Sequence, residues 1–474
     1  MGQKDSLGIN RRDVLRATAG AVFAGGMVSV AGIAGATNDK QRYIVTSNTG
    51  AAGQIESAGF DVVHSLANDT VLIVDGPRDG HSDLEAVSGV QHVVHDVEFT
   101  IDEFTVEEFS TGGSPENQLE SDGLPAFWDF QWDKHLMDVR NAHQTATGSR
   151  TRIAILDSGI QPGHPELGNL NEAASVAFID GEKITDGEPI GPTSHGVIVA
   201  GVAAAQGINV VGVAPDAELV SVRIIDVVDD ALVGRLTDVL LGMEYAAEIG
   251  ADVANLSFGP VLFPPANPHA NAALRHLFER IVNSVTRRGT VLVGPMGNNN
   301  LDYGKPVAFL PNTAAGAMGV GATTPDDLRA FYSNYGATAV DVGAPGGGYE
   351  TIEKTFCQGN GLLAGCDHPD DTPPAFADDC ECEPPTLPYP FNLVPVTWIP
   401  PGGAPTYVFT LGTSISSPQV AGIAALLREV DPDANARKIV RAIKAGAEGV
   451  RGENDPELGA GRVNAAHSIA AIQS

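Results

Sequence analysis

The sequence from Arg152 to Asp157 reads RIAILD, a short apolar run that ends in a carboxylate. Four consecutive apolar residues between charged ones predict a buried β-strand. Further strands are expected at 219–225, 253–257 and 291–293, with helices at 234–250 and 271–288. This alternation predicts an α/β fold, a parallel sheet with helices on both faces. Active sites of such sheets collect beyond the carboxyl ends of the strands, where Asp157 lies.

Two further chemically active side chains stand among small residues. His195 opens a small-residue segment that predicts a packed helix as far as Ala205, and Ser414 lies in GTSISSP, residues 412–418, ahead of another expected helix. A serine hydroxyl is a weak nucleophile that needs an imidazole to take its proton and a carboxylate to orient the imidazole. We therefore expect Asp157, His195 and Ser414 to form a catalytic triad, although each alone has an ordinary structural explanation as a turn former, a packed histidine or a helix N-cap.

The three motifs together resemble the subtilisin family of serine proteases, whose triad has the chain order Asp, His, Ser. The resemblance extends over about residues 125–474 and includes NLSFG at 255–259, APG at 344–346 and GRVNA at 461–465. It implies a serine endopeptidase with a three-layer fold and a mainly parallel sheet, most similar to secreted halophilic members of the halolysin type. It also implies that Ser257, Phe258 and Gly259 bind the substrate backbone.

A fourth catalytic residue is expected at the end of VLVGPMGN, residues 291–298. The resemblance assigns Asn298 as the donor to the negative oxygen of the tetrahedral intermediate, together with the Ser414 backbone N–H. Asn299 and Asn300 follow directly, but the register against Gly297 favours Asn298.

The sequence departs from the family pattern near the catalytic residues. Ile198 stands where a second histidine is usual, Ile415 replaces a methionine, and Gln419 replaces a histidine. None of these positions has a chemical role, so we interpret them as packing variants. A catalytically silent binding or processing partner on the same fold is the alternative function. An α/β-hydrolase esterase is disfavoured because Gly-x-Ser-x-Gly is absent around Ser414.

The composition limits the partners. Acidic residues outnumber basic ones 59 to 28, giving a net charge of −31, which disfavours nucleic acid and is typical of proteins from high-salt environments. We expect protein or peptide substrates, a monomer, no membrane association in the mature form, no metal ligands among the site residues and no cofactor for the chemistry. Structural calcium is possible, with no residues assigned.

The region before the catalytic domain has three expected parts. Residues 1–36 carry Arg11-Arg12 and then an uncharged stretch, which predicts a twin-arginine signal peptide and an extracellular protein; a membrane anchor is the alternative. Residues 37–105 have a β-α-β, α-β pattern and resemble an inhibitory propeptide, with a permanent accessory domain as the alternative. Residues 106–120 form an acidic linker suited to cleavage. The catalytic domain is expected at 121–474.

A Cys- and Pro-rich insertion is expected at about 347–408. It holds all four cysteines, Cys357, Cys366, Cys380 and Cys382. In an exported protein two disulfides are the natural interpretation, and a metal site is the alternative. Because Cys380 and Cys382 are too close in sequence to bond well, each is expected to pair with Cys357 or Cys366. The insertion could form a rim over the substrate groove or serve stability alone.

Overall fold

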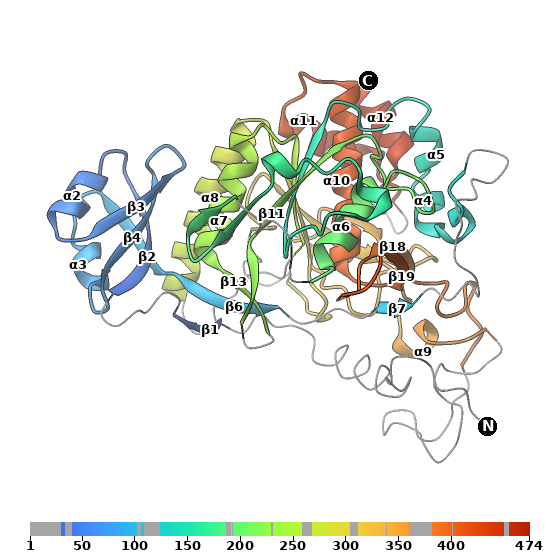
Figure 1. Cartoon of the computed structure of the whole chain (residues 1–474), viewed down its shortest axis with the longest axis horizontal. Helices are drawn as coiled ribbons and strands as arrows, with labels where there is room; N and C mark the ends of the chain where they lie inside the picture. The colour runs from blue at the N-terminus through green and yellow to red at the C-terminus, as the bar shows by residue number, and fades with distance from the viewer. Residues whose placement is uncertain are drawn as a thin grey trace, which may run out of the picture.

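The computed structural model describes residues 30–33, 40–101, 106–108, 124–185, 191, 193–228, 231–257, 268–303, 311–337, 339–359, 382–400, 402–449 and 455–474. Figure 1 shows a small N-terminal unit beside a larger α/β unit. None of the helices in the described ranges is both long and apolar enough to cross a membrane.

An eight-stranded sheet forms the centre of the larger unit, with the order β10-β9-β11-β8-β14-β15-β16-β17. All neighbours are parallel except β10 and β9 at one edge. The strands are β8 (Arg152–Asp157), β9 (Val176–Ile179), β10 (Glu182–Ile184), β11 (Glu218–Arg223), β14 (Val253–Leu256), β15 (Val291–Pro295), β16 (Ala317–Thr323) and β17 (Val342–Pro345). The predicted mainly parallel sheet is confirmed.

Helices cover both faces of this sheet because successive side chains of a strand point to opposite sides. Ile153 and Ile155 of β8 pack in one apolar cluster with helices α6 and α10, whereas Ala154 and Leu156 pack in another with α7 and α8. The first layer contains α6 (His195–Ala204), α10 (Thr413–Val430), α11 (Ala436–Gly446) and α12 (Ala465–Gln473), and the second contains α7 (Leu236–Glu248) and α8 (Pro268–Arg287). The three-layer fold is thereby confirmed.

The N-terminal unit is an antiparallel sheet of order β3-β4-β2-β5 with two helices on its outer face (Figure 1). Its elements are β2 (Lys40–Ser47), α2 (Ala52–Ser57), β3 (Asp61–Leu66), β4 (Val71–Pro77), α3 (His81–Glu85) and β5 (Val90–His95). The sequence pattern did not predict β3, an edge strand whose residues alternate between exposed and half-buried before a buried last residue.

The other face of this small sheet packs on the larger unit. Ile44 and Ile73 share an apolar cluster with Leu277 and Ile281 of α8. Arg280 of α8 donates hydrogen bonds to the carbonyl oxygens of Ser47 (2.9 Å) and Thr70 (3.2 Å). The two units are therefore joined by buried apolar surface as well as by polar contacts.

Two strands continue from the N-terminal unit onto the larger one. β6 (Val97–Ile101) pairs with β13 (Ala231–Arg235), which forms a hairpin with β12 (Ile225–Val228). β7 (Val106–Glu108) pairs with β19 (Thr406–Thr410), whose other neighbour is β18 (Val394–Trp398). On the far edge of β6 lies β1 (Val30–Ile33), within the predicted signal peptide. The remaining short helices are η1 (Trp128–Phe130), α4 (Trp132–Leu136), α5 (Val139–Ala142), η2 (Pro165–Leu167), η3 (Glu172–Ala174) and α9 (Ile352–Thr355).

The β18–β19 ribbon belongs to the body of the larger unit, although its sequence falls within the expected insertion. Val394, Val396 and Val408 are buried in a cluster with Ile198 of α6. The Thr397 hydroxyl donates to the Val197 carbonyl of the same helix at 2.8 Å. The Cys- and Pro-rich stretch therefore ends in a packed ribbon that supports α6.

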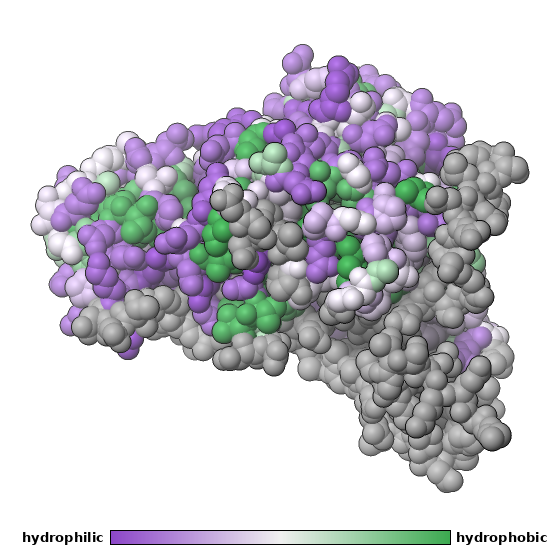
Figure 2. Space-filling view, viewed as in Figure 1, coloured by the Kyte–Doolittle hydropathy of each residue, from purple (hydrophilic) through white to green (hydrophobic). Residues whose placement is uncertain are grey.

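Hydrophilic residues cover much of the described surface seen in Figure 2, with apolar residues in separate patches. This distribution agrees with the large excess of carboxylates in the sequence.

Candidate active site

Asp157 and His195 meet at the carboxyl edge of the sheet. β8 ends at Asp157, and α6 begins at His195. The His195 Nδ1 lies 2.8 Å from Asp157 Oδ1 and 2.9 Å from Oδ2. The Asp157 carboxylate is fully buried, and Oδ1 also accepts a hydrogen bond from the Ser158 backbone N–H at 2.6 Å. A carboxylate held in this way fixes the imidazole with Nδ1 protonated and leaves Nε2 able to accept a proton.

Ser414 lies in the first turn of α10, and its side chain is half-buried. The hydroxyl of Ser257, at the end of β14, donates to the Ser414 carbonyl at 3.3 Å. Ile198 and Ile415 pack in one buried cluster, which brings together the helices that carry His195 and Ser414. These two departures from the family pattern therefore fill the space between the helices.

Gln419, the third departure, belongs to a buried polar network. Its amide donates to Asp133 Oδ2 at 2.7 Å and accepts from Lys134 Nζ at 2.8 Å. Lys134 also pairs with Asp133 Oδ2 at 2.6 Å. A buried charge is stable only when it is paired and hydrogen-bonded, and Asp133 and Lys134 pair with each other. The Gln419 side-chain amide adds a donor to Asp133 and an acceptor for Lys134.

Asn298 lies in the turn after β15 and contacts the turn before Ser414. Its Oδ1 accepts hydrogen bonds from the Thr413 N–H (2.9 Å) and hydroxyl (2.8 Å), so the amide NH2 points away from Thr413. A methyl group on Gly412 would lie 3.6 Å from Asn298 Nδ2 and 3.8 Å from the Ser414 backbone nitrogen. The Asn298 amide nitrogen and the Ser414 backbone nitrogen therefore lie near the same point beside Gly412.

Of the predicted substrate-binding residues, Ser257 is described and lies beside α10, whereas Phe258 and Gly259 lie outside the described residues. Thr413 and Tyr332 were not assigned roles from the sequence. Thr413 bridges the two turns, since its hydroxyl also accepts from the Gly297 N–H at 3.0 Å. Neither residue has a local signal, because their contacts join segments far apart in the chain.

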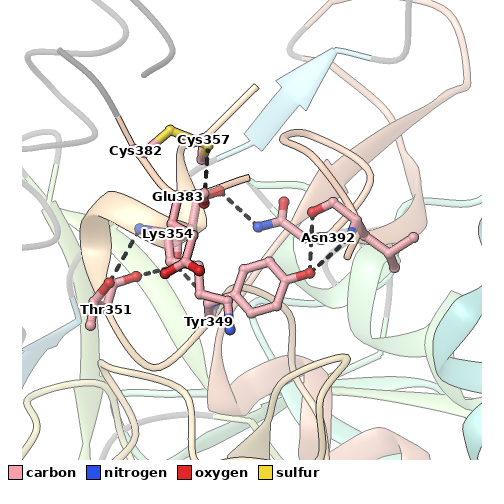
Figure 3. Close-up of a disulfide and its surroundings, with 9 residues drawn as sticks. Tyr349, Thr351, Lys354, Cys357, Cys382, Glu383 and Asn392 are labelled. Carbon is pink, nitrogen blue, oxygen red and sulfur yellow. Dashed lines mark hydrogen bonds between the residues drawn. A yellow bond between two sulfur atoms is a disulfide. The ribbon is translucent and has the colours of Figure 1, made fainter. Parts of the chain in front are cut away.

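A disulfide joins Cys357 to Cys382, with an S–S distance of 2.08 Å and Cα atoms 5.9 Å apart. Figure 3 shows it above Tyr349, Lys354 and Asn392, whose side chains tie the surrounding loops together. The Asn392 amide donates to the Thr355 carbonyl at 2.7 Å. This pairing is one of those left open by the sequence; Cys366 and Cys380 lie outside the described residues.

Among the described residues, no three His, Cys, Asp or Glu side chains lie close enough together to hold a metal ion. Glu166 is a fully buried carboxylate, but it is surrounded by donors. Its carboxylate accepts from the backbone N–H groups of Ile208 (2.9 Å), Asn209 (2.6 Å) and Val210 (3.0 Å). These donors satisfy the charge, so the Glu166 environment does not fit a cation.

This chain is similar in sequence to known proteases and similar in fold to solved structures. The sequence profile of the Subtilase family matches residues 148–461. The chain is 33% identical to subtilisin Savinase of Lederbergia lenta over 70% of this chain and 96% of that protein. It is 32% identical to the M-protease of Shouchella clausii over 70% of this chain and 68% of the relative.

Among solved structures, the epidermin leader peptide processing serine protease of Staphylococcus aureus has the same fold. Its TM-score is 0.67 at 16% identity, with 92% of this chain and 99% of that chain covered. A protease of Pseudoalteromonas arctica has a TM-score of 0.55 at 25% identity, with 73% of this chain and 98% of that chain covered. This chain belongs to the Subtilase family and is a subtilisin-like serine endopeptidase.

Proposed function

We propose that the enzyme hydrolyses peptide bonds through an acyl-enzyme on Ser414. The Ser414 Oγ attacks the carbonyl carbon while its proton passes to His195 Nε2, and the C–N bond then breaks as His195 returns this proton to the leaving amine. Water, deprotonated by His195, then attacks the ester carbonyl. The bond to Ser414 Oγ breaks as His195 returns the proton to this oxygen, which releases the second product and regenerates the enzyme. The observation that carries this assignment is the hydrogen-bonded pair of His195 and buried Asp157 at the carboxyl edge of the sheet.

Asn298 and the Ser414 backbone N–H are proposed to stabilise the negative oxygen of the tetrahedral intermediate. Both nitrogens lie close to the space beside Gly412. Because Asn298 Oδ1 accepts both hydrogen bonds from Thr413, the NH2 of the same amide is left to donate to the oxyanion beside Gly412. Donors already in place stabilise the developing charge without having to reorganise during the reaction.

Labelling with a fluorophosphonate tests the assignment of the nucleophile. The reagent should modify one serine, and the modified peptide should contain Ser414. A wild-type protein that hydrolyses peptides but is labelled elsewhere would refute the assignment. A folded protein with neither labelling nor hydrolysis would favour the alternative of a silent binding partner.

We also propose that the enzyme is made as a self-processed zymogen, inhibited by the N-terminal unit. β6 pairs with β13, whose hairpin partner β12 follows Ile224, and the Ile224 N–H donates to the Asp157 carbonyl at 2.9 Å. β7 pairs with β19, which leads directly into the Gly412–Ser414 turn. The chain between these strands contains residues 102–105, so cleavage is expected at a bond between Ile101 and Val106. This position lies just before the acidic linker expected at 106–120.

Phe99 supports the view that β6 is bound like a substrate. Its side chain is fully buried, and it lies opposite Gly234 in the β6–β13 pairing. A methyl group on Gly234 would come within 2.6 Å of the Phe99 ring. The absence of a side chain at Gly234 therefore provides the space that an apolar residue of the bound strand fills.

Secretion completes the proposal. Arg11 and Arg12 followed by an uncharged stretch support twin-arginine export, and the excess of carboxylates supports function at high salt. We assign no residue to structural calcium. The mature enzyme is proposed to act on extracellular proteins as a monomer.

A further inference from the structure

Tyr332 connects the segments that carry both proposed oxyanion donors. Its side chain is 4% exposed, and its hydroxyl donates to the carbonyl oxygens of Gly346 (2.8 Å) and Gly347 (2.9 Å). The same hydroxyl accepts from the Gly412 N–H at 3.1 Å. The Tyr332 backbone carbonyl accepts from the Asn300 N–H at 2.8 Å, two residues beyond Asn298.

The position of Gly412 makes this contact important. Gly412 has φ 148° and ψ 158°, a conformation that other residues rarely adopt. Gly412 is the N-cap of α10, so its conformation helps to fix the position of the first turn, which contains Ser414. The Gly412 N–H also donates to the Gly346 carbonyl at 2.9 Å, and the Tyr332 hydroxyl contacts both of these groups.

We propose that the Tyr332 hydroxyl is a positioning group for oxyanion stabilisation, which holds Gly412 so that the Ser414 N–H and the Asn298 amide face the same space. This inference rests on the proposed function of Ser414 and Asn298. Burial raises the pKa of the Tyr332 phenol, so the hydroxyl remains neutral and keeps its proton over the working pH range. Tyr332 itself does not touch the substrate in this role.

The test is Tyr332→Phe, which removes the hydroxyl and keeps the ring. A group that orients oxyanion donors acts in the transition state more than in the ground state, so kcat should fall about tenfold while KM changes less than twofold. The affinity for a peptide aldehyde, which forms a tetrahedral adduct with the serine, should fall in parallel with kcat. Tyr335→Phe is the matched control on the same segment, because its hydroxyl has no hydrogen-bond partner among the described residues, and it should keep wild-type kinetics.

Two further measurements separate positioning from general stability. In an Asn298→Ala background, Tyr332→Phe should reduce kcat by a smaller factor than it does in the wild type, because only the Ser414 N–H remains to be oriented. If Tyr332→Phe is too unstable to purify, 4-aminophenylalanine at position 332 keeps the donor to the Gly346 and Gly347 carbonyl oxygens. The Gly346 carbonyl also accepts from the Gly412 N–H, so holding it in place should restore kcat to within about threefold of wild type.

Unchanged kcat in Tyr332→Phe, or full additivity with Asn298→Ala, would overturn the inference in an enzyme that is otherwise active. A wild-type protein without peptidase activity would instead refute the proposed function. A kcat loss of more than tenfold in the 4-aminophenylalanine protein would also count against the inference, because the donor would be present without its effect.

Discussion

Asp96, at the end of the N-terminal unit, accepts a hydrogen bond at 3.0 Å from the backbone N–H of Thr237 in the first turn of α7. Asp238, the next residue of α7, is also buried, and its carboxylate accepts from the N–H groups of Gly181 (2.7 Å) and Asp180 (3.2 Å). Burial raises the pKa of Asp96 to about 6 and that of Asp238 well above its usual value, although Arg42 and Arg235 oppose the shift. Two carboxyl groups are thus desolvated at the interface between the two units.

The first prediction is that the N-terminal unit binds more weakly as the pH rises. A carboxyl group whose pKa is raised in the bound state favours binding at low pH, and this advantage is lost between the free value of 3.8 and the bound value of about 6. The shift of Asp96 corresponds to at most about 3 kcal/mol. After self-cleavage, size-exclusion chromatography should show the complex persisting at pH 5 and dissociating more at pH 8.

Asp96→Asn is the control for this effect, because its amide does not titrate. The variant should bind with a smaller difference between pH 5 and pH 8. A wild-type complex that binds equally well at both values would contradict the prediction.

The second prediction concerns the catalytic groups. Ser414→Ala, His195→Ala and Asp157→Ala should each lower kcat by several orders of magnitude, and combined variants should lose little more. The reason is that the three side chains act as one unit in proton transfer. Steady-state hydrolysis of a chromogenic peptide measures this, and near-normal turnover by the His195 variant would show that the triad is wrongly assigned.

Asn298→Ala should lower kcat by about 10²–10³ with a small change in KM, as loss of the corresponding donor does in subtilisin. Asn300→Ala is the matched control, because Asn300 accepts a hydrogen bond from Arg329 rather than bordering Gly412. A large kcat loss in the control with normal activity in Asn298→Ala would mean that the register of the turn is wrong.

Self-cleavage should stop in Ser414→Ala, which should remain full length apart from removal of any signal peptide. In the active enzyme, mass spectrometry should place the new N-terminus between residues 102 and 106. Processing of the Ser414 variant at the same bond in a protease-free system would refute cleavage by the enzyme itself.

Replacing Cys357 and Cys382 together by serine should lower the free energy of unfolding by about 3 kcal/mol. The reason is that the disulfide closes a loop with a sequence separation of 25 and so reduces the conformational entropy of the unfolded chain. Thermal melting with and without reductant measures the effect. Reductant should lower the Tm of the wild type towards that of the variant. Equal melting temperatures for variant and oxidised wild type would contradict the prediction.

The parts of the fold that were predictable have strong local patterns. β8 is an uninterrupted apolar run, and the predicted helix at 271–288 agrees with α8 at Pro268–Arg287. The predicted helix at 234–250 begins instead at Leu236, because Gly234 belongs to β13, where it pairs with Phe99. The start of this helix is therefore set by a contact with β6, which is distant in sequence, so the local pattern around residue 234 could not predict it.

The parts that were not predictable depend on distant contacts. β3 alternates between half-buried and exposed residues, and β18 contains Pro395, which is unusual within a strand. At the candidate site, the residue types of the proposed triad and of Asn298 could be recognised from their motifs. The bridging roles of Thr413 and Tyr332 could not, because Thr413 joins two turns and Tyr332 joins three segments that are far apart in the chain.

The bond between Cys357 and Cys382 has a practical consequence for redesign. Their Cα atoms lie 5.9 Å apart, so the two ends of the intervening chain are close together. The cost of closing such a loop rises only slowly with its length, and the ends need not move when the contents change. The segment between the two cysteines is therefore a suitable place to graft an affinity tag or a small second domain onto a working protease.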